Sequence, residues 1–302
     1  MPKLDLSIII VSFNTREILT DCIKSVIKFT SGLEYEIIIV DNGSKDGSME
    51  RIKELSKKYS QVSLIDAKSN IGFGKAQNLG SKKAKGKYLL LLNSDTLLFD
   101  NALKVSLDNL KKISGCGVYS CQLLNADRSA QASGGHFPTL GNVFAWQFFI
   151  DDLPLVGGLI PSFHPHLASY NLNKQIDWIT GAFMIIPKKI FDEVGGFDEN
   201  IFMYTEEMEL CFRINKLGYQ TVYQNSPAII HLGGASSGSV LALSSEVKNM
   251  IYFWGKHKPS WQLPLIKFFF FTGSLLRLLI FGIIKGDEKA KRAYTQALRL
   301  IF

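Results

Sequence analysis

Cysteine is scarce in this chain, which has four cysteines in 302 residues, and no two of them have the spacing of metal ligands. Small secreted domains rely on dense disulfide frameworks, so this composition favours a reducing cytosol. The N-terminus lacks the basic region, apolar stretch and cleavage site of a signal peptide, and we expect none. The sequence also has no internal repeat and no low-complexity segment. With 46% hydrophobic and 20% charged residues, it has enough apolar mass for a core, which excludes a disordered or fibrous chain.

Charge is placed unevenly along the sequence. The formal net charge is +7, and from Glu246 onward ten basic residues stand against three acidic ones. The tail therefore carries the whole net charge, and the preceding part is neutral. A neutral body argues against binding of nucleic acid, whereas the basic tail predicts an anionic membrane surface as its partner.

Strands and helices alternate over the first hundred residues. The predicted strands are apolar runs rich in β-branched residues or leucine: Leu6–Val11, Glu36–Val40, Val62–Ile65 and Tyr88–Leu92. Helices should follow the first three strands, and Asn14 with Glu17 offers a capping-box start for the first of them. This α/β alternation predicts a mostly parallel sheet with helices on both faces and a ligand crevice at the carboxyl ends of the strands.

The pattern changes after Gly117. Residues 137–174 mix proline, glycine and aromatic residues without a clear period, and we predict no element there. Regular structure returns in four segments, namely a strand at Trp178–Pro187, a helix at Glu206–Leu217, and strands at Tyr219–Tyr223 and Ala228–His231.

Polar residues cluster where three of the predicted strands end. The clusters are Ser12 with Asn14, Asp41 with Asn42, and Asn93 with Asp95. Each cluster alone reads equally well as a turn. Three in succession point to one crevice, in which a carboxylate accepts from a pyrimidine ring N–H and the other groups hold ribose or phosphate. The nearby Gly72-x-Gly74 turn lacks a dinucleotide fingerprint and a phosphate loop.

Two groups of residues are candidates for chemistry. Asp95 in Asn93-Ser94-Asp95 can hold Mg²⁺ or Mn²⁺ through oxygen, and His231 at the end of the last strand can supply a further ligand or be purely structural. The acidic set Glu206, Glu207 and Glu209 opens a helix. Negative charge there either complements the helix dipole or provides a general base.

The order of these motifs resembles the family 2 glycosyltransferases, especially the bacterial rhamnosyltransferases of O-antigen and cell-wall polysaccharide assembly. The motifs are Val-Ser-Phe-Asn, Asp-Asn-Gly-Ser, Asn-x-Gly-Phe-Gly-x-x-x-Asn, Asn-Ser-Asp, Gly-Gly-Phe-Asp-Glu, Glu-Glu-x-Glu-Leu and His-x-Gly-Gly. They extend from Leu6 to about Ser237. The resemblance implies a GT-A fold in residues 1–240, a nucleotide-sugar donor, a divalent metal (Mg²⁺ or Mn²⁺) and inversion at the anomeric carbon.

The resemblance also implies roles for single residues. Asp41 would bind the base, Ser12 and Asn14 the nucleoside, and Asp95 with His231 the metal. The usual Asp-x-Asp is here Asn93-Ser94-Asp95, with one carboxylate fewer. Glu207 takes the place of the catalytic base, one methylene longer than the usual Asp, and Glu206 is the reserve candidate. The other residues expected at the donor site are Asn42, Asn70, Gly72, Asn78, Asn93 and Ser94.

The expected reaction is transfer of a sugar to a lipid-linked saccharide acceptor in bacterial cell-surface polysaccharide assembly, with dTDP-rhamnose as the favoured donor. The alternatives are a UDP-hexose donor, or a non-catalytic partner subunit that binds a nucleotide sugar. A hydrolase would need two opposed carboxylates and no cradle for a diphosphate.

The tail, residues 241–302, is predicted to be a membrane-associated helical region. Leu263–Ile284 is long enough to span a bilayer, but Arg277 lies near its middle, where a charge costs at least about 2.5 kcal/mol. We therefore expect a helix in the interface at the cytoplasmic face of the bacterial inner membrane, bound peripherally. The alternative is that this segment packs on the catalytic domain or forms an oligomer contact.

Overall fold

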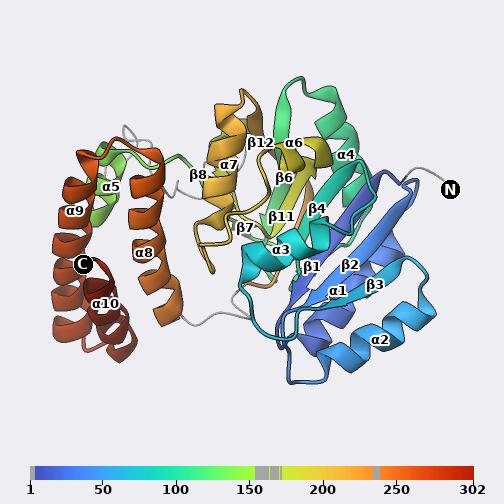
Figure 1. The fold of residues 1–302 in the computed structure, drawn as a ribbon, viewed down its shortest axis with the longest axis horizontal. Helices are drawn as coiled ribbons and strands as arrows, with labels where there is room; N and C mark the ends of the chain where they lie inside the picture. Colours follow the sequence, from blue (N-terminus) through green and yellow to red (C-terminus); the bar gives the residue numbers. More distant parts are fainter. Residues whose placement is uncertain (1–3, 154–162, 164–169, 171, 234–238) are drawn as a thin grey trace. The chain divides into compact units, whose positions relative to one another are not determined.

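A ten-stranded mixed sheet is the framework of the computed structural model, which describes residues 4–153, 163, 170, 172–233 and 239–302 (Figure 1). The sheet lies in the first of two units, residues 1–134, 166–202 and 206–236, which we call the sheet unit. The second, the helical unit, consists of residues 135–165, 203–205 and 237–302.

The first half of the sheet contains four parallel strands in the order β3-β2-β1-β4. Their bounds are β1 (Leu6–Ser12), β2 (Tyr35–Asp41), β3 (Val62–Asp66) and β4 (Tyr88–Asn93). Four helices accompany them: α1 (Arg16–Phe29), α2 (Ser48–Lys58), α3 (Phe73–Ser81) and α4 (Ala102–Lys112). The α/β architecture with a mostly parallel sheet, predicted from the alternation, is confirmed.

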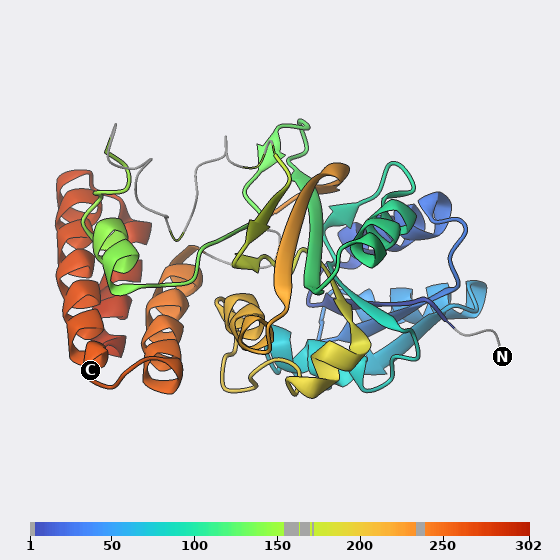
Figure 2. The same ribbon diagram turned by 90° about the horizontal axis from the view of Figure 1, so that it is seen from above.

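The apolar side chains of this half explain why helices cover both faces of the sheet (Figure 2). Alternate strand residues such as Ile8, Ile37 and Leu90 form one core with buried residues of α1, α2 and α4. On the opposite face α3 lies close to the strands, because Gly80 has no side chain. A Cβ on Gly80 would lie 2.4 Å from Cγ2 of Ile9.

The capping box predicted at the start of α1 is wrong. Thr15 is the N-cap and makes no side-chain cap bond. Asn14 instead adopts a left-handed backbone conformation with φ +54°, and its Oδ1 accepts from the backbone N–H of Lys45 at 2.7 Å. The side chain thus ties two loops of the strand edge together, and a contact between separate loops is not visible in local spacing.

The second half of the sheet is mixed. Its strands are β5 (Thr96–Leu97), β6 (Cys116–Leu124), β7 (Ala130–Gln131), β9 (Lys174–Ile176), β11 (Phe183–Pro187) and β12 (Gln220–His231). Strand β11 runs antiparallel to β4 and β6, whereas β12 is parallel to β6. Two short strands, β8 (Gly134–Gly135) and β10 (Trp178–Ile179), pair outside this sheet. Helices α6 (Lys188–Glu193) and α7 (Glu206–Lys216) complete the half.

Two strand predictions in this half are wrong. The strand expected at Trp178–Pro187 is interrupted between Ile179 and Phe183, where the backbone leaves the ladder and places Gly181 beside α7. The two final strands are one strand, β12, with a register irregularity between Tyr223 and Ala228. Pro227 lies in that irregularity, and proline has no N–H for a ladder bond.

Part of the segment for which we predicted no element is helical. Helix α5 (Leu140–Gln147) begins with a capping box in which Thr139 and Asn142 bond reciprocally. Other parts of residues 137–174, and Ser237 at the end of the motif series, lie outside the described residues.

The helical unit consists, in its described part, of α5, α8 (Ser239–His257), α9 (Gln262–Arg277), η2 (Leu278–Ile284) and α10 (Glu288–Leu300). Its core includes Phe253, Trp254 and Phe270. Arg277 is buried here: it donates to the carbonyls of Gln147 and Trp146 at the end of α5, with its guanidinium 4.3 Å from the ring centroid of Phe149. The C-terminal carbonyls of a helix favour a cation, so this charge is satisfied within the protein.

Helix α9 and η2 also carry exposed apolar side chains along one line. These residues, which we call the apolar stripe, are 40 to 62% exposed: Trp261, Leu265, Phe268, Leu275, Leu279 and Ile283. Their spacing of three, four or seven residues keeps them on one helix face. Among the described residues one helical stretch, Gln262–Ile284, is long and apolar enough to cross a membrane, with a mean hydropathy of 1.8.

All four cysteines are free and buried in the sheet unit. Burial raises the pKa of the Cys22, Cys116 and Cys211 thiols to about 12, and it raises the pKa of Cys121 further. These thiols are therefore protonated core side chains at neutral pH.

Candidate active site

The carboxyl ends of β1, β2 and β4 bring the first three predicted clusters to one edge of the sheet. Ser12 pairs with Asp41 in the β1–β2 register, and Val11 pairs with Asn93 in the β1–β4 register. The side chains expected at one crevice therefore do lie at the same level of adjacent strands. Ser12 is fully buried, and its hydroxyl is 3.1 Å from that of Thr15.

Asp41 has one carboxylate oxygen engaged and one buried without a partner. Oδ2 accepts from the backbone N–H of Ser44 at 3.1 Å. Oδ1 is buried and has no hydrogen-bond partner among the described residues. A buried acceptor left unpaired costs free energy, so its presence at a strand edge points to a donor supplied by a ligand. A ring N–H of a nucleotide base provides such a donor.

The second and third motifs are joined through Asn42. Its Nδ2 donates to Oδ1 of Asn70 at 3.0 Å, and its Oδ1 accepts from the N–H of Ile71 at 2.9 Å. Both ends of this amide are used within the protein, so Asn42 and Asn70 hold the turn that leads into α3.

The backbone conformation and the close neighbours of residue 72 require a glycine there. Its φ is +92°, and a Cβ on it would lie 2.6 Å from the carbonyl oxygen of Phe202. The close approach lets the N–H of Phe73 donate to that oxygen at 2.9 Å. Gly72, a residue of the third motif, thereby fixes Phe202, which lies shortly before the acidic helix.

Asn78 has a similar joining role. Its Nδ2 donates to the carbonyl of Phe197 at 2.9 Å, and its Oδ1 accepts from the N–H of the same residue at 2.8 Å. The Gly-Gly-Phe-Asp-Glu segment is therefore held against α3 through the backbone of Phe197.

Asp95 and His231 meet as predicted from their positions at strand ends. His231 Nε2 is 3.3 Å from Oδ1 of Asp95 and 3.3 Å from Nδ2 of Asn93. Asp95 is 6% exposed and Ser94 8%, so the cluster is nearly closed to solvent. The N–H of Leu232 donates to the carbonyl of Asp95 at 2.9 Å, which fixes the end of β12 against the loop after β4.

The tautomer of His231 follows from its other neighbours. Gln131 Nε2 donates to Oδ1 of Asn125 at 3.1 Å, so its Oε1 faces His231 Nδ1, at 2.6 Å. Nδ1 is therefore the donor to Gln131, and Nε2 faces Asp95. A partner that fixes the second ring nitrogen is typical of metal-binding histidines.

The spacing of this pair is compatible with a divalent cation. Two neighbouring ligands of an octahedral ion, each about 2.1 Å from it, lie about 3.0 Å apart. The 3.3 Å between His231 Nε2 and Asp95 Oδ1 is close to that separation. Within the described ranges no cluster of three or more His, Cys, Asp or Glu side chains exists. A Mg²⁺ or Mn²⁺ ion held by two protein ligands completes its sphere with water and substrate phosphates.

The acidic start of α7 contains two adjacent carboxyls, of which Glu206 is buried and Glu207 half-buried. Burial raises the pKa of Glu206 well above its usual value, and the negative charge of Glu207 raises it further. Burial also raises the pKa of Glu207, while hydrogen bonds from the N–H of Gly181 and from the Glu206 side chain oppose that rise. Burial therefore favours the protonated form of Glu206 more strongly than that of Glu207.

Gly181 connects this pair to the metal-site residues. Its N–H donates to Oε1 of Glu207 at 3.1 Å, and the carbonyl of the next residue, Ala182, accepts from the N–H of Asn93 at 3.1 Å. A Cβ on Gly181 would lie 3.2 Å from Oε1 of Glu207. Two consecutive residues of the interrupted strand thus connect Glu207 to the backbone of Asn93, at the end of the strand that leads to Asp95.

Glu209, the third acidic residue of the helix, forms an ion pair inside the protein. It is fully buried and accepts from Arg213, which also donates to the carbonyls of Val194 and Gly196. The ion pair satisfies both charges and anchors the glycine pair to α7.

Sequence reasoning missed Gln131, Asn125 and Gly181. Gln131 lies in a two-residue strand, and Gly181 lies where a continuous strand was expected, so neither stands in a recognisable motif. Asp66 was also missed. It pairs with Asp41 in the β2–β3 register, and hydrogen bonds from Lys68 lower the pKa of its exposed carboxyl.

The mixed sheet and this strand-edge site define a GT-A glycosyltransferase fold. The chain belongs to the family described as Glycosyl transferase family 2, which matches residues 7–171, more than half of its length. The resemblance inferred from the motifs is therefore confirmed.

Relatives of known name are similar over most of the chain. N-acetylglucosaminyl-diphospho-decaprenol L-rhamnosyltransferase of Mycobacterium tuberculosis is 25% identical over 251 residues, 76% of this chain and 78% of the relative. Rhamnosyltransferase WbbL of Escherichia coli is 26% identical over 205 residues, 65% of this chain and 72% of the relative. The crystal structure of GalNAc-T7 with UDP, GalNAc and Mn²⁺ has a TM-score of 0.66 at 17% identity, covering 99% of this chain and 56% of the GalNAc-T7 chain.

Proposed function

We propose that this glycosyltransferase transfers rhamnose from dTDP-rhamnose to a lipid-linked saccharide, with inversion at the anomeric carbon, in bacterial cell-surface polysaccharide assembly. The observation that carries the proposal is the Glu206–Glu207 pair, joined through Gly181 and Ala182 to Asn93 beside His231. A base beside a cation site suits attack of a hydroxyl on a nucleotide sugar. The names of two relatives support the choice of rhamnose.

The donor would bind along the ends of β1, β2 and β4. Asp41 Oδ1, buried and unpaired among the described residues, would accept from the base, while Ser12 and Asn14 contact the nucleoside. Asn42, Asn70, Gly72 and Asn78 shape the loops around the donor through their bonds within the protein. Asn93 and Ser94 border the diphosphate end of the site.

Asp95 and His231 would hold the metal, with Gln131 fixing the imidazole. When bound, Mg²⁺ or Mn²⁺ supplies Lewis-acid stabilisation of the negative charge on the departing nucleoside diphosphate. Two protein ligands leave positions open for phosphate oxygens and water.

Glu207 would act as the general base. Its carboxylate takes the proton of the acceptor hydroxyl, whose oxygen forms a bond to the anomeric carbon while the bond from that carbon to the diphosphate oxygen breaks. The electron pair of the broken bond leaves with the nucleoside diphosphate. Glu206, whose pKa burial raises well above its usual value, would keep its own proton beside the base. A base with a pKa raised by burial accepts a proton more readily than an ordinary carboxylate.

We further propose that residues 1–240 form the catalytic domain and that the helical region 241–302 binds the cytoplasmic face of the bacterial inner membrane peripherally. The apolar stripe supports this placement, because its six residues are exposed on a single helix face. Buried Arg277 argues against a bilayer span, since its cation is bonded to carbonyls of α5.

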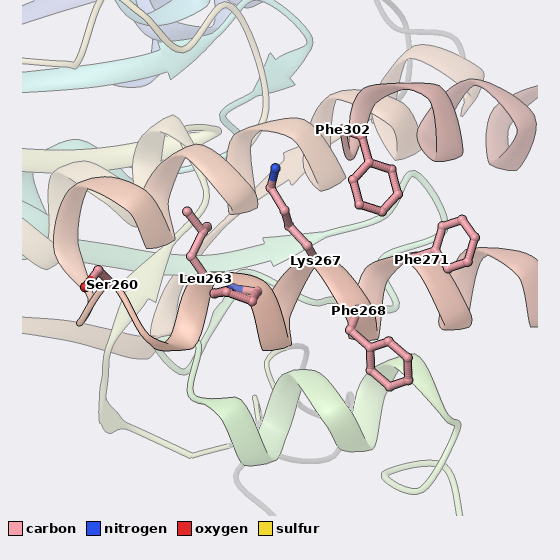
Figure 3. Close-up of a pocket in the computed structure, with 7 residues that line it drawn as sticks. Ser260, Leu263, Lys267, Phe268, Phe271 and Phe302 are labelled. Atoms are coloured by element: carbon pink, nitrogen blue, oxygen red, sulfur yellow. The ribbon is translucent and has the colours of Figure 1, made fainter.

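A groove next to the stripe adds to this apolar surface (Figure 3). Its volume is about 450 Å³, and Phe268, Phe271 and Phe302 line it together with one cation, Lys267. The surplus of ten basic over three acidic residues from Glu246 onward suits an anionic lipid surface.

The direct test is release of nucleoside diphosphate from a panel of nucleotide sugars, with and without Mn²⁺ and with a lipid-linked acceptor. The proposal expects acceptor- and metal-dependent release with dTDP-rhamnose, and thermal stabilisation by that donor. Release with a UDP-hexose alone would reassign the donor. Donor binding without any release would identify a non-catalytic nucleotide-sugar-binding subunit.

A further inference from the structure

Three residues directly before the acidic pair belong to the helical unit. Residues 203–205 are part of that unit, whereas the chain on either side, ending at Phe202 and resuming at Glu206, belongs to the sheet unit. The segment that leads into the candidate base is therefore built into the helices of the C-terminal region.

One side chain of α8 holds this segment. Asn249 donates through Nδ2 to the carbonyl of Met203 at 2.8 Å and to the carbonyl of Tyr204 at 2.8 Å. It is 6% exposed. A primary amide has two N–H donors, which allows one for each of two successive carbonyls. Aspartate, which has nearly the same shape, offers no such donor.

The segment has a backbone that needs such support. Tyr204 and Thr205 have φ values of +68° and +69°. A left-handed conformation is unfavourable for residues with a Cβ, and two in succession persist only where the surroundings fix them. The chain enters α7 directly from these residues, so their conformation sets the direction in which the helix begins.

Glu206 and Glu207 are the first two residues of that helix. We propose that Asn249 is a positioning residue for the acidic pair: it fixes the left-handed turn at residues 204–205 and thereby sets where the Glu207 carboxylate lies. The inference rests on the function proposed for Glu207.

The test compares Asn249→Asp and Asn249→Ala with Gly255→Ala in the full-length chain. Aspartate keeps the shape of the side chain and has no N–H donors, whereas alanine removes the donors without placing a charge near the carbonyls. Gly255 is exposed on the same helix, and a Cβ on it would meet no atom within 4 Å. We expect kcat for sugar transfer to fall at least about tenfold in both Asn249 variants, with donor Kd within about twofold of the parent and Gly255→Ala unchanged. Amide exchange at residues 204–207 should also accelerate.

Two outcomes separate the possible failures. If either folded Asn249 variant keeps the parent kcat while Glu207→Gln is inactive, Glu207 remains the base and the positioning role is refuted. If Glu207→Gln itself turns over normally, the proposed base is refuted independently of Asn249. A parallel loss of kcat and donor binding in both Asn249 variants also refutes the proposal, because positioning of the base predicts that only kcat falls.

Discussion

Replacement of Glu207 by glutamine removes basicity with very little change in shape. The glutamine carbonyl can still accept from the N–H of Gly181, which lies 3.1 Å from Oε1 in the parent. Its amide group can face Glu206 in place of the hydrogen-bonded oxygen. The neighbours of Gly181, including Ala182 with its bond to Asn93, should therefore remain where they are.

The expected loss follows from the role of the proton. General-base help contributes roughly 10²- to 10⁴-fold in rate, and an amide cannot take a proton from the acceptor hydroxyl. We expect kcat to fall at least about a hundredfold, which corresponds to about 2.7 kcal/mol in activation free energy. Donor affinity should stay within about twofold, because Asp41, Asp95 and His231 are unchanged.

The assay measures nucleoside diphosphate released in the presence of acceptor, and calorimetry measures donor binding with Mn²⁺. Glu206→Gln is the matched control, since it changes the adjacent carboxyl of the same pair, and its amide can still donate to Glu207. Near-normal turnover in Glu207→Gln would remove Glu207 as the base. Loss of turnover in Glu206→Gln alone would transfer the role to Glu206.

Three further predictions follow from the site and the tail. Asp95→Ala should abolish Mn²⁺-dependent donor binding. His231→Ala and Gln131→Ala should weaken Mn²⁺ binding less, and the loss of affinity expected for Gln131→Ala is about 10- to 100-fold. If Mn²⁺ titrations followed by electron paramagnetic resonance are unchanged in these variants, the metal binds elsewhere. The raised pKa of Glu206 means that the folded chain binds more protons than the unfolded chain above the usual pKa of 4.5, so unfolding free energy falls as pH rises through this range. Glu206→Gln should therefore raise Tm more at pH 7 than at pH 4.5, and equal shifts at both pH values would contradict the assignment. The double variant Phe268→Glu with Leu279→Glu should release the chain from anionic vesicles. High salt should release the parent only partly, because screening of the charges leaves apolar burial intact. If the double variant binds vesicles as well as the parent does, the apolar stripe is not the contact.

Point substitutions suit the tail better than truncation. Helix α8 contacts both α9 and α10, and its Phe253 and Trp254 are buried. Deleting residues 263–302 would uncover these side chains and disturb the helix that carries Asn249. A change in the exposed stripe leaves that packing in place.

The sequence predicts the parts of this fold that depend on local pattern. Apolar strands separated by amphipathic helices identify β1 to β4, and polar residues at their ends identify the edge where Ser12, Asp41 and Asn93 meet. Contacts between distant segments were not predictable in this way. The interruption at Gly181 follows from a bond to Glu207 26 residues later, and the orientation of His231 depends on Gln131, 100 residues before it. Asn249 is a further case, since nothing in the pattern of α8 indicates which carbonyls its amide contacts.

The burial of all four thiols has a practical use in spectroscopy. Thiol-specific labels react with the thiolate, which buried groups with a pKa of about 12 scarcely form at neutral pH. A cysteine introduced by Phe268→Cys would therefore be the preferred attachment point for a spin label or a polarity-sensitive fluorophore, without prior replacement of the native cysteines. Such a probe on the exposed face of α9 would report the depth of that helix in a lipid vesicle directly, while the sheet unit retains its native core.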